Sequence, residues 1–220
     1  MTLTLDRIGP LHDAQRTASS RWTTQEKMPT PASFGADDAA RLREAGIGDL
    51  SFTRRAGLKG PGAAAWLQEH GMATPDRPNS WVRAQCGSLV ARLGLTEYVV
   101  VASSDSLGLQ TALRQVPRGV YPVARFDADL LLAGRQVHDL FKQTCAFDFE
   151  SLDPTAQPLV MTSMVGVGVT VLALSIGSQR HYRLWCDGTY GGYLWNTLVE
   201  VAESLGGGAV GLEALGPLAR

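Results

Sequence analysis

Three residues near the end of the chain, His181, Cys186 and Asp187, carry groups that occur in nucleophilic catalysis. A cysteine becomes a nucleophile when a neighbouring histidine takes its proton and a third group orients the imidazole. His181 and Cys186 are five residues apart on a predicted strand, so their side chains should point to opposite faces. We therefore predict core and surface roles for them, and the sequence predicts no catalytic residue in this chain.

A second chemical signal is the glycine pattern Val165-Gly166-Val167-Gly168-Val169. A dinucleotide-binding loop needs a third glycine and a helix that follows it. Residues 170–175 instead continue as a strand of β-branched and aliphatic residues. The pattern therefore predicts a turn or bulge, and it identifies no cofactor-binding residue.

Histidines and cysteines are the residues that would form a metal site or a disulfide. The spacing of His70 and His138 offers no ligand set, and Cys86, Cys145 and Cys186 include no CxxC pair. We predict no metal site and no disulfide framework, which fits a reducing cytoplasm. His70 should end a helix, where a cation suits the dipole, and His138 should lie on the solvent face of another.

Four aromatic residues crowd one glycine-rich stretch: Trp185, Tyr190, Tyr193 and Trp195. Aromatic side chains mostly fill cores, which favours packing under a sheet. The alternative is a subunit contact, because exposed aromatic residues are typical anchors of interfaces.

The composition is that of an ordinary globular protein, with 45% hydrophobic and 19% charged residues among 220. Twenty basic and 21 acidic residues give a net charge of −1, which excludes a general electrostatic surface for nucleic acid. A solvated face is the default for Arg41, Arg43, Arg54 and Arg55. Residues 155–179 lack charge, but their glycines and β-branched residues favour strands over a membrane helix. No signal peptide is recognised, so we expect a cytoplasmic protein.

From Asp49 onward the hydrophobic pattern occurs twice. Gly60-Pro61-Gly62 and Gly134 each open a predicted helix with one apolar stripe. The two stripes differ by a constant 74 residues (141 − 67 and 137 − 63), and they consist of Ala63, Trp66, Leu67 and His70, and of Val137, Leu140, Phe141 and Thr144.

A strand and a second helix follow in each copy. The strands centre on Tyr98 and Tyr182, so their offset is ten residues larger than the offset of 74 between the helices. The polar loop at 148–158 accounts for the extra residues. The predicted helices bear the stripes Leu109, Ala112, Leu113 and Val116, and Leu194, Leu198, Val201 and Leu205.

The fold class we predict is therefore α+β, with two pseudo-symmetric ferredoxin-like βαββ(β)α halves. The first half should span residues 47–118 and the second residues 119–205. Residues 1–46, with one short helix at 37–45, should be an extended N-terminal arm, either loose or ordered by a partner. Residues 206–220 should be a glycine-rich tail with a final ordered turn.

Three stretches within residues 46–205 carry a resemblance to the folate-binding aminomethyltransferase (glycine-cleavage T-protein) superfamily. Gly48-Asp49-Leu50-Ser51-Phe52, followed by residues 58–67, resembles the opening motif of that superfamily. Residues 92–101, RLGLTEYVVV, resemble its R-L-G strand. The third match is a set of separate segments: residues 123–128, the second glycine-initiated helix, Arg183-Leu184-Trp185 and Tyr193-Leu194-Trp195. This set resembles the gamma subunits of multi-subunit sarcosine oxidases.

The departures from the superfamily pattern concern its chemistry. Folate-using members have an acidic pair just before the R-L-G strand, where this chain has Cys86 and Gly87. Neither can act as a carboxylate near neutral pH. The asparagine expected after the strand is replaced by Val101 and Ala102, and the C-terminal domains of a full T-protein are missing.

The resemblance therefore implies a non-catalytic gamma subunit that assembles with alpha, beta and delta subunits and oxidatively demethylates sarcosine to glycine only in that complex. It implies no cofactor in this chain, with FAD, FMN, NAD and tetrahydrofolate in the partner subunits, and no membrane or nucleic-acid partner. One alternative is a subunit of a related complex such as N-methylglutamate dehydrogenase. Others are a stand-alone folate-dependent protein or, with Pro61 where a cysteine is needed, an iron–sulfur maintenance protein.

Overall fold

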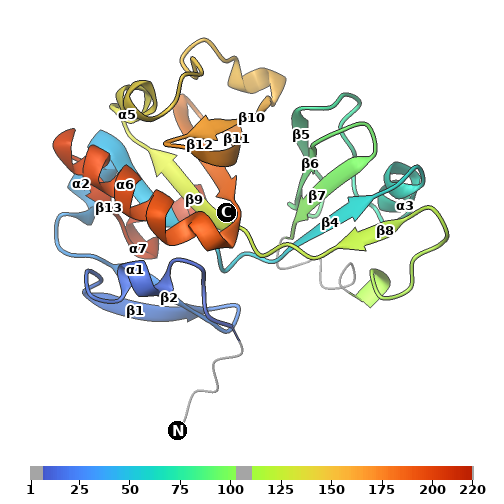
Figure 1. The fold of residues 1–220 in the computed structure, drawn as a ribbon, viewed down its shortest axis with the longest axis horizontal. Coiled ribbons are helices and arrows are strands. Elements are labelled where there is room, and N and C mark those ends of the chain that lie inside the picture. Colours follow the sequence, from blue (N-terminus) through green and yellow to red (C-terminus); the bar gives the residue numbers. More distant parts are fainter. Residues whose placement is uncertain (1–6, 103–110, 220) are drawn as a thin grey trace, which may run out of the picture. The chain divides into compact units, whose positions relative to one another are not determined.

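The computed structural model describes residues 7–102 and 111–219, which divide into two compact units (Figure 1). Each unit contains its own β-sheet. Unit 1 takes its described residues from 7–52, 126–155 and 161–219, and unit 2 from 53–102, 111–125 and 156–160.

Unit 1 is built on a six-stranded sheet with the order β10-β11-β12-β9-β3-β13. The pairs β11–β12, β12–β9 and β3–β9 are antiparallel, and the short β13 lies parallel to β3. In chain order the strands are β3 (Gly46–Asp49), β9 (Ala128–Ala133), β10 (Leu159–Met164), β11 (Val167–Ile176), β12 (Gln179–Cys186) and β13 (Gly208–Ala209).

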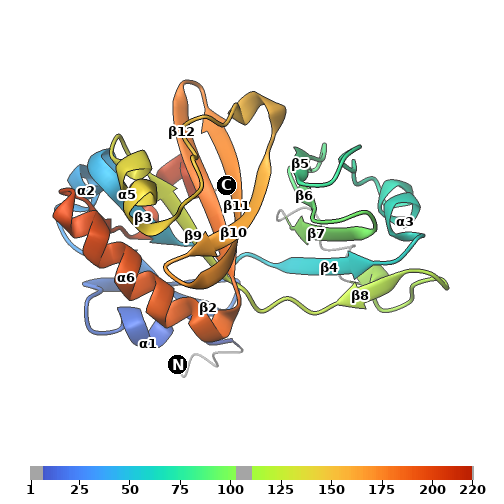
Figure 2. The ribbon, with the colours of Figure 1, turned by 45° about the horizontal axis from the view of Figure 1, so that its top comes forward.

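Three helices, α2, α5 and α6, pack beside this sheet, and Figure 2 shows them grouped together. They span Asp38–Ala45, Val137–Thr144 and Gly191–Ser204. The register pairs Tyr182 with Leu132, and the Tyr182 ring meets Phe141 of α5 edge-on at 4.9 Å. Because side chains alternate along a strand, Leu131 points to the other face, where it packs with Leu215 of α7 (Leu212–Leu215).

The N-terminal region is folded, so the predicted extended arm is wrong for the described residues from 7 onward. It forms α1 (His12–Gln15) and a hairpin of β1 (Arg21–Gln25) and β2 (Met28–Ser33). The turn residues Glu26 and Lys27 have φ values of 47° and 62°. Such a tight turn usually contains Asn-Gly or Asp-Gly. Glu-Lys occupies it here, so the sequence carries no sign of a hairpin.

Unit 2 is built on a five-stranded antiparallel sheet with the order β5-β6-β7-β4-β8. The helix α3 (Ala63–Glu69) covers it, and Trp66 and Leu67 join Tyr98 in a buried apolar cluster. The strands are β4 (Arg55–Lys59), β5 (Ser80–Arg83), β6 (Leu89–Arg92), β7 (Glu97–Val101) and β8 (Tyr121–Val123).

Arg92 at the end of β6 ties two loops of unit 2 together. Its guanidinium donates to the carbonyl oxygens of Pro75 (3.1 Å), Asp76 (2.6 Å), Gly94 (3.2 Å) and Leu95 (2.8 Å). The same guanidinium lies 5.5 Å from the centre of the Tyr98 ring. Arg92, the arginine of the R-L-G motif, therefore has a structural role in this unit.

The two predicted glycine-initiated helices are confirmed as α3 and α5. Gly60 and Gly134 precede them with φ values of 114° and 123°, a conformation that favours glycine. A Cβ at Gly60 would collide with the carbonyl oxygen of Gly119, and one at Gly134 with that of Glu44. The predicted helix around Leu109–Val116 lies partly in residues 103–110, outside the described residues.

The predicted boundaries of the halves differ from the observed units. The strand β3 pairs with β9 in the sheet of unit 1, while β8 pairs with β4 in unit 2. Residues 46–49 thus belong with the later part of the chain, and residues 121–123 with the earlier part. Local hydrophobic patterns do not encode such long-range pairing.

The remaining segments are short. Short 3₁₀ turns span Pro154–Ala156, Gly188–Tyr190 and Gly216–Ala219. The expected tail from 206 onward contributes β13 and α7 to unit 1, so it is more ordered than predicted. Val165 and Gly166 form the turn between β10 and β11, which confirms that the glycine pattern is a turn. Within the described residues, no helix has the length and apolarity needed to span a membrane.

Candidate functional site

A buried ion pair lies on the face of the unit 1 sheet opposite α5. Asp129 of β9 is 0% exposed and Arg183 of β12 is 6% exposed. The guanidinium donates to the carboxylate through both Nε and Nη2. Nε lies 2.9 and 2.8 Å from the two oxygens, and Nη2 lies 2.5 Å from Oδ2. Such charge-assisted geometry compensates both charges, so the pair suits anchoring two strands.

Asp49 of β3 lies on the other face of the sheet, the one covered by α5, and is linked to Asp129 through Ser51. Its Oδ1 accepts the backbone N–H of Ser51 at 2.8 Å, and the Ser51 hydroxyl oxygen accepts the backbone N–H of Asp129 at 3.1 Å. Burial raises the pKa of Asp49, hydrogen bonds from Ser51 and Gln15 lower it, and the charge of Asp129 raises it further. Burial is the largest of these effects, so the pKa of Asp49 lies above its usual range.

Trp185 lies beside this ion pair in the register of the sheet. It is paired with Asp129 across β12 and β9 and is fully buried. Its indole Nε1–H has no hydrogen-bond partner in the part of the chain that the structure describes. Together, these residues supply a compensated charge pair, a protonatable carboxyl and one unused donor.

The structure separates the first candidate pair, His181 and Cys186. The sheet register pairs them with Ala133 and Ala128, an odd number of residues apart, which places them on opposite faces as predicted. Burial, followed by the charges of Asp127 and Asp187, raises the pKa of the Cys186 thiol to about 12. The thiol is therefore protonated near neutral pH and is a poor nucleophile.

Cys86 and Gly87 lie in the tight turn between β5 and β6. The N–H of Gly87 donates to the carbonyl oxygen of Ala84 at 2.9 Å, and its φ is 83°. The Cys86 sulfur lies 3.3 Å from the Ser88 hydroxyl and 3.9 Å from the Met72 sulfur. This turn thus requires a small, flexible residue and places a thiol among apolar and weakly polar groups.

The two histidines in question have structural partners. His70 follows α3 as predicted, with Nδ1 2.8 Å from the carbonyl oxygen of Trp66. The prediction for His138 is wrong, because this residue is half-buried and its Nε2 lies 2.6 Å from the Tyr182 hydroxyl. Burial lowers the pKa of His138. The described residues contain no group of three or more His, Cys, Asp or Glu arranged for a metal ion.

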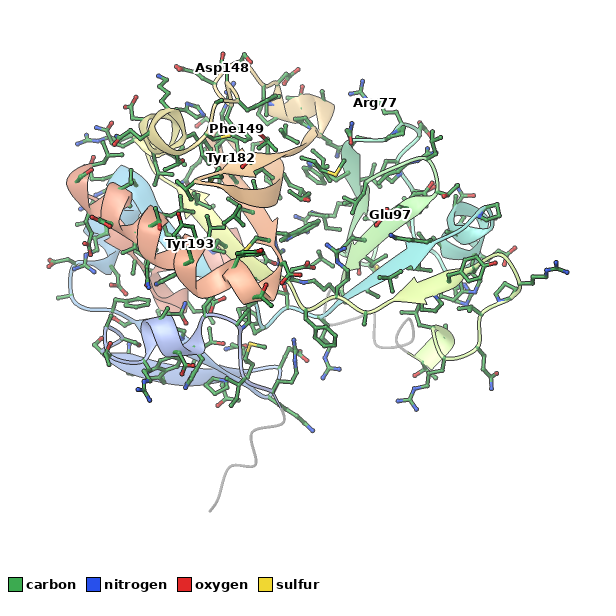
Figure 3. All side chains as sticks on the ribbon, in the orientation of Figure 1. Arg77, Glu97, Asp148, Phe149, Tyr182 and Tyr193 are labelled. Atoms are coloured by element: carbon green, nitrogen blue, oxygen red, sulfur yellow. The ribbon has the colours of Figure 1, made fainter. Side chains whose placement is uncertain are left out.

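The four crowded aromatic residues split into two pairs. Trp185 and Trp195 are buried, as the core interpretation predicts, whereas Tyr190 and Tyr193 are exposed. The Tyr193 hydroxyl donates to the carbonyl oxygen of Val165 at 3.1 Å, and Figure 3 shows this residue on α6. The core interpretation is thus confirmed for the two tryptophans, and a subunit contact stays a prediction for the two exposed tyrosines. Of the four arginines, 41 and 43 lie on α2 of unit 1 and 54 and 55 in unit 2.

The Asp129–Arg183 pair was not predicted from the sequence. The available signal was a charged residue inside each of two otherwise apolar strands, ADLLLA and the RLW stretch. A buried strand rarely contains a charge without a partner, so two such strands could have been paired.

Taken together, the fold is α+β, with mixed and antiparallel sheets covered by helices. Two solved structures share this fold over most of the chain. Aminomethyltransferase T of the glycine cleavage system from Bartonella henselae matches with a TM-score of 0.73 and 14% identity. The match covers 96% of this chain and 61% of that protein, so this chain spans about three fifths of its length.

A chain of the heterotetrameric sarcosine oxidase from Corynebacterium sp. U-96, solved with pyrrole 2-carboxylate, matches with a TM-score of 0.62 and 20% identity. Here the match covers 92% of this chain and 97% of the other. No protein-family model and no curated protein sequence matches the chain. At these identities the similarities establish the fold alone.

Proposed function

We propose that this chain is a non-catalytic, gamma-type subunit of a sarcosine-oxidase-type complex. The observation that carries the proposal is the near-complete mutual coverage, 92% and 97%, with a chain of a heterotetrameric sarcosine oxidase. The aminomethyltransferase, by contrast, extends well beyond this chain, which covers 61% of it. A shared fold over most of both chains supports a comparable subunit role.

In this proposal the chain assembles with alpha, beta and delta subunits in the cytoplasm. The complex would convert sarcosine to glycine by oxidative demethylation. FAD, FMN, NAD and tetrahydrofolate would all belong to the partner subunits, with none in this chain. The contribution of this subunit would be shape and contact surface rather than chemistry.

The side chains at the expected folate position support a structural role. Cys86 and Gly87 form a β-turn and bring no carboxylate to that position. Asp129 is already neutralised by Arg183. Asp49, whose pKa is raised by burial, is enclosed by hydrogen bonds from Ser51.

Exposed apolar side chains around the start of α6 support a contact with another protein. Phe126 is 84% exposed and Tyr190 is 56% exposed, and Ile8 and Tyr193 are also more than half exposed. A Cβ at Gly188 would lie against both the Phe126 carbonyl and Pro10, so these segments share one surface region. Aromatic residues at such a position are typical anchors of protein interfaces.

The finer description of the fold is part of the same proposal. The order β4, α3, β5, β6, β7 in unit 2 parallels β9, α5, β10, β11, β12 in unit 1, and the sheet orders β5-β6-β7-β4 and β10-β11-β12-β9 correspond. This correspondence supports two pseudo-symmetric halves, each with three strands after its first helix. In each unit the helix after the first of these strands, α3 or α5, packs on one face of the sheet in the manner of an α+β layer.

The test is co-purification of the tagged full chain with the products of neighbouring reading frames. We expect a flavin spectrum and sarcosine oxidation in the complex, and neither in the chain alone. Changing Tyr190 and Tyr193 to serine should reduce recovery of flavoprotein by about tenfold or more. Tyr121→Ser, at a residue that is 58% exposed in unit 2, is the matched control. Sarcosine oxidation by the isolated chain would disprove the proposal.

A stand-alone folate-dependent protein is the second candidate. The higher TM-score of 0.73 to aminomethyltransferase T favours it. Calorimetry with tetrahydrofolate separates the two, because micromolar binding by the isolated chain would support a folate protein. The related complex, N-methylglutamate dehydrogenase, is distinguished by offering N-methylglutamate and sarcosine to the purified assembly.

A further inference from the structure

A cavity of about 310 Å³ lies within unit 1, between α1, α2, α6 and β13. Its size is at the lower end of the range for small-molecule sites. The residues that line it fall into an apolar group and a charged group. They are Ala14, Ala18, Phe34, Arg41, Trp195, Asn196, Val199, Glu200, Glu203 and Ala209.

The apolar wall of the cavity contains two packed aromatic rings. Phe34 and Trp195 are stacked, with ring centres 5.9 Å apart and an angle of 29° between the rings. Both are almost fully buried, and Trp195 is held on the 14-residue helix α6. The stacked rings, together with the alanines of the lining, provide an apolar surface for an aliphatic or aromatic group.

The charged wall brings opposite charges to one place. Arg41 of α2 and Glu203 of α6 both pass within 4 Å of the point where Gly208 would carry a Cβ. Glycine at 208, with a φ of 138°, leaves this space open. Glu200 lies one helical turn before Glu203 on α6 and also lines the cavity.

The charged groups of Arg41, Glu200 and Glu203 are not paired with one another. Over residues 7–102 and 111–219, neither Arg41 nor the two glutamates takes part in an ion pair. One Arg41 hydrogen bond is described, a long one of 3.4 Å from Nη1 to the carbonyl oxygen of Ala209. The guanidinium therefore keeps donors for an anionic group, and the carboxylates keep acceptors for a cationic one.

From this arrangement we infer that the cavity binds a small zwitterionic amino acid with an apolar side chain. The ligand carboxylate binds Arg41, its ammonium group binds Glu203 or Glu200, and its side chain lies against Phe34 and Trp195. A simple anion would meet the two carboxylates, and a simple cation would meet the guanidinium, so a ligand with both charges fits best. The site is independent of the proposed subunit role.

The test is calorimetry or ligand-observed NMR on the full chain, or on the complex from which it is purified. The probes are L-leucine, 4-methylpentanoate, which lacks the ammonium group, and 3-methylbutylamine, which lacks the carboxylate. We expect L-leucine to bind with a Kd on the order of 1 mM, and each analogue at least about tenfold more weakly. Failure of L-leucine to bind at about 20 mM, or equal binding of the three probes, overturns the inference.

Charge-neutral variants give a crossed pattern that a nonspecific apolar cavity cannot produce. Arg41→Gln should weaken L-leucine binding about tenfold and strengthen 3-methylbutylamine binding. Glu203→Gln should weaken L-leucine binding and strengthen 4-methylpentanoate binding. Arg43→Gln, on the same helix and outside the cavity lining, is the matched control. Unchanged L-leucine binding in both Arg41→Gln and Glu203→Gln, with native circular dichroism, would refute the assignment.

Discussion

The two units place a tyrosine at corresponding points of their sheets, Tyr98 on β7 and Tyr182 on β12, but surround it differently. Tyr98 lies under Trp66 of α3, with the Arg92 guanidinium over its ring. Tyr182 lies among Phe141 and other aromatic rings, and its hydroxyl meets His138. Figure 3 shows Tyr182 and Phe149 in the same part of unit 1, and their ring centres are 5.9 Å apart.

The units also differ in how an arginine holds the sheet. In unit 1, Arg183 binds a buried carboxylate, Asp129. In unit 2, the partly exposed Arg92 binds four backbone carbonyl oxygens in two loops. The comparison teaches that two sheets with similar strand orders need not share a polar network. A buried charge needs a charged partner, whereas an arginine near water can be satisfied by carbonyl groups.

The largest expected effect comes from breaking the ion pair of unit 1. Asp129→Ala should lower the free energy of unfolding by about 3–5 kcal/mol, because it leaves the Arg183 charge buried without its carboxylate. Urea denaturation of the full chain measures the change. The double variant Asp129→Leu with Arg183→Met should recover stability to within about 1–2 kcal/mol of the native protein. A loss below about 1 kcal/mol in the single variant would contradict the anchoring role.

A smaller effect is expected from the arginine of unit 2. Arg92→Met keeps the aliphatic stem but removes all donors, which should cost about 1–2 kcal/mol because part of the loss is made good by water. Amide hydrogen exchange should increase in β6 and β7 and stay unchanged in β12. Arg77→Met is the matched control, since Arg77 is exposed and donates one long bond of 3.4 Å to Ala156.

The tyrosine comparison can be sharpened by removing single hydroxyl groups. Tyr182→Phe should cost about 1 kcal/mol, because it removes the bond to His138 (2.6 Å) and the longer one to the Phe149 carbonyl (3.4 Å). Tyr98→Phe should change stability by less than about 0.5 kcal/mol, since no described residue hydrogen-bonds its hydroxyl. Equal effects in thermal unfolding of the two variants would argue against the difference between the units.

The smallest effect should appear in the pH dependence of unit 1. Burial lowers the pKa of His138, aided by Arg180 and Lys142 and opposed by Glu150 and Asp139. The unfolded chain therefore binds the proton more readily, so stability should decrease as pH falls from about 6.5 toward the folded pKa. His138→Asn should flatten this slope in urea denaturation series. A slope of the opposite sign would show that the charged imidazole is favoured in the folded state.

Part of the fold follows from local patterns in the sequence. The residues of β7 agree with the predicted strand at 97–101, and α3 and α5 begin three residues after Gly60 and Gly134. Such features depend on alternation, on a helical stripe, and on a glycine that can adopt positive φ. All three are properties of neighbouring residues, so a sequence alone is enough to predict them.

The pairing of distant segments was decided only by the tertiary structure. β13 lies beside β3, Asp129 meets Arg183 across 54 residues of chain, and the region from residue 7 to 46 folds into unit 1. The cavity near Arg41 likewise needs helices from both ends of the chain. Local periodicity states which face of an element is apolar but not which partner will cover it. That choice depends on the combined packing of the whole unit and on the compensation of each buried charge.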